Sequence, residues 1–193
     1  MSEATTFPRV QQLQIGYAPL EDRILLRLTL VSEGGCNAWV PRAVAGPLVE
    51  RLNAALKRSH PAAETAPADD TVMALEHIAA RSQLAGAADA VSDDLAEASR
   101  TAQAAGPVTP WTTHLVSEAR VEAGDEGGLR IGLLGHRLTA EGLARGEAEA
   151  VAGLMLERAQ AHELLRMVTE QAEQAGWALE GLRVWPRWLA RKI

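Results

Sequence analysis

The chain has 193 residues and a net charge of −6, with 47% hydrophobic and 23% charged residues, the composition of an ordinary globular protein. A chain of this length buries about 70% of the surface that its unfolded form exposes, so it needs no disulfide or structural metal to fold. The negative charge argues against a protein that holds nucleic acid across a broad basic face, although a local basic patch is compatible with it. Cys36 is the single cysteine, which excludes an intrachain disulfide and fits a reducing compartment.

The N-terminal segment lacks the features of an export signal. Residues 1–13 contain no basic start and no apolar core, both of which a Sec signal peptide requires. No apolar run in the chain approaches the ~18 residues that suggest a membrane span. The sequence therefore predicts a cytoplasmic protein without a transmembrane segment.

The first unit begins with strand-like segments. Residues 11–19 alternate apolar and polar side chains, and residues 23–31 form the strongest strand pattern in the chain. Alternation at period two is typical of a half-buried strand, and the short turn at residues 20–22 predicts a hairpin. A second turn at residues 32–35 leads to a short third strand at residues 36–41.

An amphipathic helix is predicted next, ending near residue 58. Its apolar side chains recur at helical spacing and are Val44, Leu48, Val49, Leu52, Ala55 and Leu56. Pro47 interrupts this pattern. Because proline is tolerated in the first turn of a helix but not in its interior, we expect the helix to begin near Arg42 with residues 42–45 as a lead-in, and its regular part to begin near Gly46.

The middle of the chain is interpreted as a linker and a helical insert. Residues 59–68 contain prolines and small side chains, which are typical of a linker. Asp69 and Asp70 can cap a helix over residues 71–85, whose core-facing stripe would consist of the apolar residues Val72, Leu75, Ile78 and Ala79, extended by Ser82. A weaker helical stretch is predicted at residues 91–105, followed by a break at residues 106–110.

The second unit repeats the order of the first. Strands are predicted at residues 112–123, 129–134 and 150–157, with a polar excursion at residues 136–146 before the third. A helix over residues 159–175 follows, with an apolar stripe of Ala161, Leu164, Leu165, Val168, Ala172 and Ala175. Gly176 suits the position just after the helix.

The two predicted helices match in their apolar positions when they are aligned at one fixed offset. Leu48 then meets Leu164, and Leu52 meets Val168. The sequence therefore predicts an α+β fold of two antiparallel three-strand-plus-helix units joined by a helical insert, a pattern consistent with internal duplication. The expected boundaries are 1–58 for the first unit, 59–110 for the linker and insert, 111–178 for the second unit and 179–193 for a tail. The sheet faces opposite the helices are also partly apolar, and they would pack together or against a partner.

The tail is the least ordinary stretch of the chain. Residues 183–193, RVWPRWLARKI, combine tryptophans with four cations in an acidic protein. Aromatic and arginine side chains are favoured anchors at interfaces, so the residues predicted to bind a partner are Trp185, Arg187, Trp188, Arg191 and Lys192. The partner would be an acidic protein surface or, as peripheral contact, a membrane. Alternatively, the tail folds back onto the sheet with its tryptophans in the core.

No pattern for catalysis, a cofactor or a metal is present. None of the five histidines lies at metal-ligand spacing from another histidine or from Cys36. His162 shares a helix flank with Arg158 and Arg166 and is expected at the surface, whereas Cys36 is expected to be a small buried or loop residue. Phosphate-binding glycine loops and a nucleophile elbow are absent from the sequence. We therefore predict no catalytic, cofactor-binding or metal-ligating residues.

Three hypotheses about function follow. The first is a non-catalytic protein that acts by protein–protein contact, as a homo-oligomer or as an accessory or structural subunit of a bacterial-type cytoplasmic assembly. The second is a β-sheet protein that binds single-stranded nucleic acid, which requires stacking aromatic side chains and a basic groove and is disfavoured by the net charge. The third is a small-molecule-binding domain or enzyme with its site between the two halves.

Overall fold

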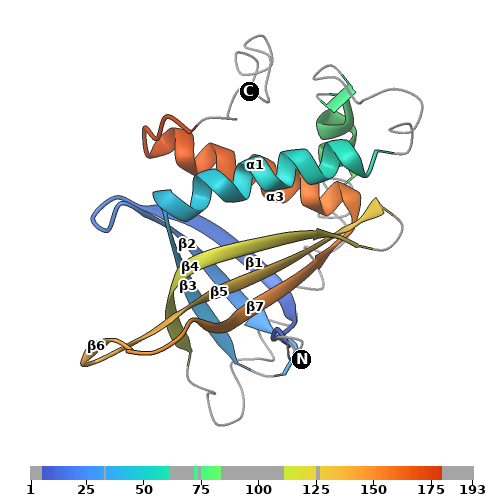
Figure 1. Cartoon of the computed structure of the whole chain (residues 1–193). Coiled ribbons are helices and arrows are strands. Elements are labelled where there is room, and N and C mark those ends of the chain that lie inside the picture. The colour runs from blue at the N-terminus through green and yellow to red at the C-terminus, as the bar shows by residue number, and fades with distance from the viewer. Residues whose placement is uncertain are drawn as a thin grey trace, which may run out of the picture.

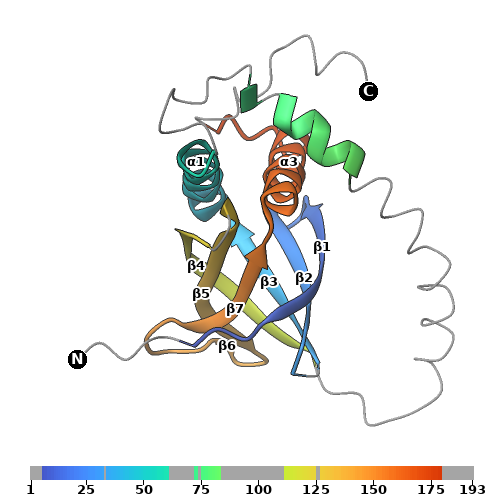
Figure 2. The same ribbon diagram turned by 90° about the vertical axis from the view of Figure 1, so that its right-hand side faces the viewer.

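The computed structural model describes residues 6–32, 34–60, 72–73, 75–83, 111–124 and 127–179. Their strands form one sheet of seven, and two long helices lie side by side over its concave face (Figures 1 and 2). This arrangement confirms the predicted α+β class. No helix in this part of the chain is long and apolar enough to cross a membrane.

The elements follow the predicted order. The strands are β1 (Val10–Ala18), β2 (Arg23–Leu30), β3 (Gly35–Pro41), β4 (Thr112–Ala123), β5 (Leu129–Thr139), β6 (Gly142–Leu143) and β7 (Glu149–Leu156). The long helices are α1 (Arg42–Arg58) and α3 (Arg158–Gln174). Residues 72–73 and 75–83 are also helical and are called the insert helix below.

Each unit contributes an antiparallel set of strands to one shared sheet. β1, β2 and β3 pair in order, and β4, β5 and β7 do the same, with β6 beside the far end of β5. The units join through β3 and β4, which pair in parallel from Cys36 opposite Thr112 to Trp39 opposite Leu115. The sheet faces away from the helices therefore belong to one continuous surface and do not pack against each other.

The sheet curls until its first and last strands meet at a seam. Arg9 forms a parallel bridge with Gly153, and the Gly153 N–H donates to the Pro8 carbonyl at 2.7 Å. Phe7 lies over Gly153 and over Gly132, its neighbour on β5. A Cβ at Gly132 would lie 2.6 Å from the Phe7 ring, and a Cβ at Gly153 would lie 2.7 Å from the Phe7 Cβ. The absence of both side chains therefore allows this closure.

The core lies between the concave face and the helices. Every residue of the predicted α1 stripe is buried, and so is the predicted α3 stripe except for Ala175, which is half-buried. The sheet contributes alternating side chains, including Ile24, Leu26 and Leu28 of β2. The Gly176 prediction is also confirmed: φ is +66°, and Trp177 N–H donates to the Ala172 carbonyl at 2.9 Å, which is a Schellman ending.

Two elements differ from the prediction in extent or regularity. α1 begins at Arg42 as predicted, but it is regular helix from that residue through Pro47 and not only from Gly46, because burial of Val44 and Ala45 holds the first turn against the core. Pro47 has no N–H to donate to the carbonyl of Ala43, four residues earlier. Both residues are exposed, so this carbonyl is on the solvent side of the helix. β5 continues to Thr139 and pairs with β6, so the predicted excursion at residues 136–146 begins as an extension of the sheet.

Most of the predicted stripe of the insert helix faces away from the core, and of its residues Val72 alone packs against it. Leu75 is 61% exposed and Ile78 is 41% exposed, whereas Met73, His77 and Ala80 are buried. The helix docks through the flank that carries His77, because that flank meets polar partners on α3, described below. The second helical stretch predicted at residues 91–105 lies outside the described residues.

Candidate functional site

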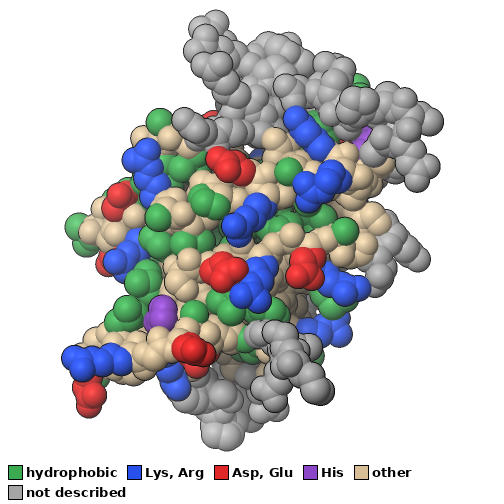
Figure 3. Space-filling view, viewed as in Figure 1, with side chains coloured by type: hydrophobic (Ala, Val, Ile, Leu, Met, Phe, Trp, Pro, Cys, Tyr) green, Lys and Arg blue, Asp and Glu red, His purple; other side chains and the backbone are tan. Residues whose placement is uncertain are grey.

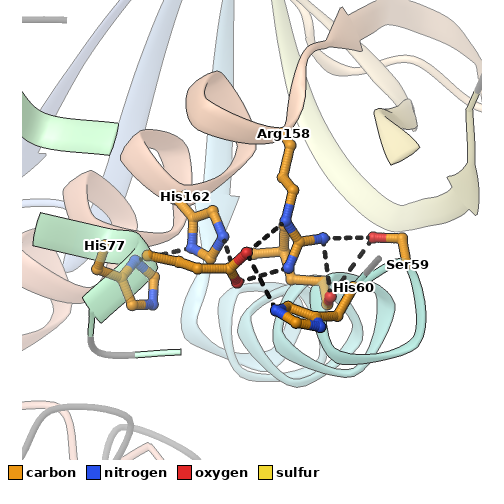
Figure 4. Close-up of polar contacts among 7 residues, drawn as sticks. Ser59, His60, His77, Arg158 and His162 are labelled. Atoms are coloured by element: carbon orange, nitrogen blue, oxygen red, sulfur yellow. Dashed lines mark hydrogen bonds and ion pairs between the residues drawn. The ribbon is translucent and has the colours of Figure 1, made fainter. Parts of the chain in front are cut away.

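A cluster of polar side chains connects α1, α3 and the insert helix (Figure 4). The Arg158 guanidinium, at the start of α3, donates to both carboxylate oxygens of Glu76, with Nε to Oε1 at 3.0 Å and Nη2 to Oε2 at 2.6 Å. Its Nη1 donates to the Leu56 carbonyl at 3.0 Å and to the Ser59 hydroxyl at 2.8 Å, both at the end of α1. One side chain therefore joins α1, α3 and the insert helix.

Two buried histidines lie beside this ion pair. The Nδ1 atoms of His77 and His162 are 3.0 Å apart, and the rings meet edge to face. Burial lowers the pKa of His77 to about 3 and the pKa of His162 to about 4, so both rings are neutral at pH 7 and one donates to the other. The prediction that His162 lies at the surface is wrong. His162 is on the polar flank of α3, and the insert helix packs against that flank and buries it.

The cluster has the chemistry of a helix junction. Burial opposes ionisation of Glu76, but the hydrogen bonds and positive charge of Arg158 outweigh it and lower the pKa of this carboxyl group. The carboxylate is therefore already neutralised by an arginine. Within the described ranges, no group of three or more His, Cys, Asp or Glu side chains could hold a metal ion.

Two hollows lie beside the end of β7. The larger, about 500 Å³, is bordered by the β4–β5 connection and the start of α3, and its lining includes Arg130, Glu157 and Arg158. The smaller, about 270 Å³, lies between β1, β7 and α3 and is called the seam groove. Met155 and Leu156 line both. Met155 is 58% exposed, so an accessible apolar side chain stands between the two hollows.

The seam groove is mainly apolar. Its lining consists of Val10, Gln11 and Leu13 from β1, Leu154, Met155 and Leu156 from β7, and Gln160, Glu163, Leu164 and Met167 from α3. Glu163 is the single charged residue in this lining, and it accepts from Arg166 at 2.6 and 2.9 Å. The groove therefore offers no free charge of its own.

The strands that flank the groove are open toward it. In the described part of the chain, one isolated bridge crosses the seam, between Arg9 and Gly153, and it includes the hydrogen bond from the Gly153 N–H to the Pro8 carbonyl. Apart from the bridge at Arg9, β1 and β7 do not pair with each other, and residues of both strands line the groove. Unpaired edges of this kind can accept an additional strand.

The predicted partner-binding residues Trp185, Arg187, Trp188, Arg191 and Lys192 lie outside the described residues. Among the described residues, Trp177 is the aromatic residue closest to them in the sequence. The sequence pattern predicts no role for it. Its Nε1–H donates to Asp22 Oδ1 at 2.8 Å, and the Tyr17 hydroxyl donates to the same oxygen at 2.8 Å. Hydrogen bonds from Trp177 and Tyr17 lower the pKa of Asp22. These contacts hold the end of the second unit on the first hairpin.

The other cysteine and histidine side chains that could carry chemistry are Cys36, His114 and His136. Cys36 is buried as predicted, and burial raises the pKa of its thiol to about 11, so it is no thiolate nucleophile at neutral pH. His114 is buried and pairs with Glu149 at 2.9 Å. His136 is half-buried on β5.

Comparison with known proteins found no family model, no curated protein and no solved structure that matches the chain. The argument about function therefore depends on the geometry of the molecule.

Proposed function

We propose that the protein is a non-catalytic interaction protein, an accessory or structural subunit, that binds an extended segment of a partner protein in the seam groove. The observation that supports this proposal is the open seam. Two strand edges face an apolar hollow and are joined, among the described residues, by one isolated bridge, between Arg9 and Gly153. An extended segment that entered the groove would pair with the free edge of β1 as an added strand.

Strand addition supplies both affinity and selectivity. Main-chain hydrogen bonds to an open edge hold the segment, and pockets for alternate side chains select its sequence. In the seam groove, inward side chains of the segment would contact Leu13, Leu164 and Met167. Because the lining offers no free charge, a charged inward side chain would lose hydration without a partner. The expected ligand therefore alternates apolar side chains, facing inward, with polar ones.

The lining also favours binding over catalysis. The seam groove lies between strands of the first and second units, where a small-molecule site was expected as an alternative. Its polar side chains are Gln11, Gln160 and Glu163, and the carboxylate is engaged by Arg166. An acid–base pair would need a titratable group able to reach a substrate, and this lining does not supply one.

The tail belongs to the same proposal as a second contact. Residues 183–193 would add an electrostatic attachment to an acidic partner, independent of the groove. Cytoplasmic location and membership of a larger assembly remain predictions from the sequence.

The experiment is selection from a displayed library of random peptides, followed by affinity measurement and hydrogen exchange. Selected peptides should show alternating apolar residues and should slow exchange of β1 backbone amides. Met155→Glu and Met167→Glu should each weaken binding by about ten-fold or more, since a charge would be placed against apolar ligand atoms. Leu143→Glu is the matched control, because Leu143 is 47% exposed but lies on β6, away from the groove.

Deletion of residues 183–193 should leave affinity for the selected peptides unchanged, which separates the groove from the tail. Selected peptides without an alternating pattern, or protection confined to another element, would show that the groove is not the binding site.

A further inference from the structure

The convex face of β2 and β3 carries arginine and tryptophan side chains in adjacent rows. Leu26 and Ala38 face the core, and because strand side chains alternate, Leu25 and Trp39 face the other way. These two residues are directly opposite each other, and Trp39 is opposite Leu115 on β4. The result is a half-buried apolar row across three strands.

Arginines occupy the rows on both sides of Trp39. Arg27 is opposite Asn37, one row toward the start of β3, and Arg23 is opposite Pro41, one row in the other direction. Successive rows on one face are two residues, about 7 Å, apart along a strand. Trp39 therefore lies between two guanidinium groups on the same face.

A second tryptophan continues the series beyond Arg27. Trp111, which is 41% exposed, packs against Gly35, where a Cβ would lie 2.8 Å from the indole ring. The Arg27 guanidinium carbon lies 5.2 Å from the centroid of a Trp111 ring, a cation–π distance. The order along the strands is therefore Trp111, Arg27, Trp39 and Arg23.

The charge of this face differs from that of the rest of the sheet. Neither Arg23 nor Arg27 forms an ion pair with any described residue. Polar neighbours in the same rows, such as Gln14, Asn37 and Thr113, are neutral. Over β4 and β5, by contrast, basic and acidic side chains are interspersed (Figure 3), and Arg120 pairs with Glu118 at 2.9 Å. The series on β2 and β3 is thus a local basic patch in an acidic protein.

We propose that this face binds single-stranded nucleic acid, with bases stacked on Trp39 and Trp111 and phosphates held by Arg23 and Arg27. Every base has a face that can stack on an aromatic ring, and every nucleotide brings one negative charge. An alternation of rings and cations matches that repeat. An acidic peptide would use the arginines but leave the tryptophans without a matching group. The site is separate from the seam groove, which lies where β1 approaches β7.

The test is fluorescence anisotropy of a labelled oligothymidylate of about 12 nucleotides, within the range of single-strand site sizes, with the full chain. The oligonucleotide should bind at low salt, about 50 mM, and dissociate steeply as salt rises.

Trp39→Leu should weaken binding by about ten-fold or more, because it keeps an apolar side chain but removes the stacking ring, whereas Trp39→Phe should retain most of the affinity. Arg27→Gln should reduce the slope of log affinity against log salt by about 0.7, the value for one phosphate contact on a single strand. Arg58→Gln, on the exposed side of α1, should leave that slope unchanged.

Circular dichroism and thermal unfolding establish that each variant is folded. If Trp39→Leu does not fold, Trp111→Leu at the more exposed ring provides the same comparison. Absence of binding at low salt would overturn the proposal. So would binding that is abolished by deleting residues 183–193 but unaffected by Trp39→Leu, or affinity for an acidic peptide in place of the oligonucleotide.

Discussion

His77 and His162 share a hydrogen bond between their Nδ1 atoms at 3.0 Å, with 3% and 2% of their surfaces exposed. One ring must be the donor and the other the acceptor, which requires at least one neutral ring. Glu76 from the insert helix, Arg158 from α3 and His60 after α1 surround the pair. The docking of the insert helix on α3 is therefore linked to the protonation of these rings.

Acid should release this contact. Burial lowers the pKa of His77 to about 3 and of His162 to about 4, below the value of about 6.5 for an unperturbed histidine. The unfolded chain therefore binds more protons than the native protein between these values, so stability rises with pH in that window. The stabilising contribution is complete above about pH 6.5 and is lost as the pH falls toward the folded values.

The measurement is the free energy of unfolding by urea at a series of pH values between about 5 and 7, above the range in which most carboxylates titrate. The double variant His77→Leu/His162→Leu should have a shallower pH dependence than the wild type, and Leu75→Gln, at an exposed side chain that does not titrate, should keep the wild-type slope. Equal slopes for the double variant and the wild type would contradict the linkage.

Arg158 should be far more sensitive to substitution than the other arginine of α3 that forms ion pairs. Its side chain is 18% exposed and reaches three helical segments, so Arg158→Lys should lower the free energy of unfolding by about 2 kcal/mol through loss of the forked contacts. Arg166 pairs with Glu163 and Glu170 on its own helix, and Arg166→Lys should cost less than about 0.5 kcal/mol. Chemical denaturation of both variants checks the difference, and equal losses would argue against the junction role of Arg158.

The orientation of the insert helix predicts an inverted substitution pattern. Met73→Gln should destabilise the protein by about 2 kcal/mol or more, because Met73 is fully buried. Leu75→Gln, at a side chain that looks like core in the sequence, should change the free energy of unfolding by less than about 0.5 kcal/mol. Thermal denaturation of the two variants distinguishes this orientation from the one predicted by the sequence, in which Leu75→Gln would be the costly change.

The glycines beneath Phe7 should tolerate a methyl group only when Phe7 is removed. Gly132→Ala should destabilise the protein by about 1–3 kcal/mol, since the new Cβ would overlap the ring. In a Phe7→Ala background the same substitution should cost much less, so the two changes should be strongly non-additive. Additive effects in a double-mutant cycle would mean that Phe7 does not occupy this position in solution.

The sequence predicts local structure well where one periodic pattern meets one large core. The stripes of α1 and α3 are buried as predicted, because Leu48, Leu52, Leu164 and Leu165 have no other apolar surface to meet. The β1–β2 hairpin is also confirmed, since a short turn leaves adjacent strands little choice of partner. The confirmed α+β class follows from these elements.

Periodic patterns of apolar residues do not predict the orientation of the insert helix or the pairing of the two units. Leu75 and Ile78 define an apolar stripe, but the cluster around Arg158 lies on the other flank and determines how the helix docks. The parallel pairing of β3 with β4 depends on residues far apart in the chain, which alternation does not encode. The seam groove likewise requires β1 and β7 to approach each other, and its lining residues share no motif.

The parallel pairing of β3 and β4 has a consequence for biosynthesis. The first unit is completed long before residues 112–115 emerge from the ribosome, and until then β3 has no neighbour on the edge that β4 later occupies. An exposed edge beside apolar residues such as Trp39 and Val40 can pair with another chain. The nascent first half is therefore the stage at which aggregation or capture by a chaperone is expected, and synthesis of β4 ends that vulnerable interval.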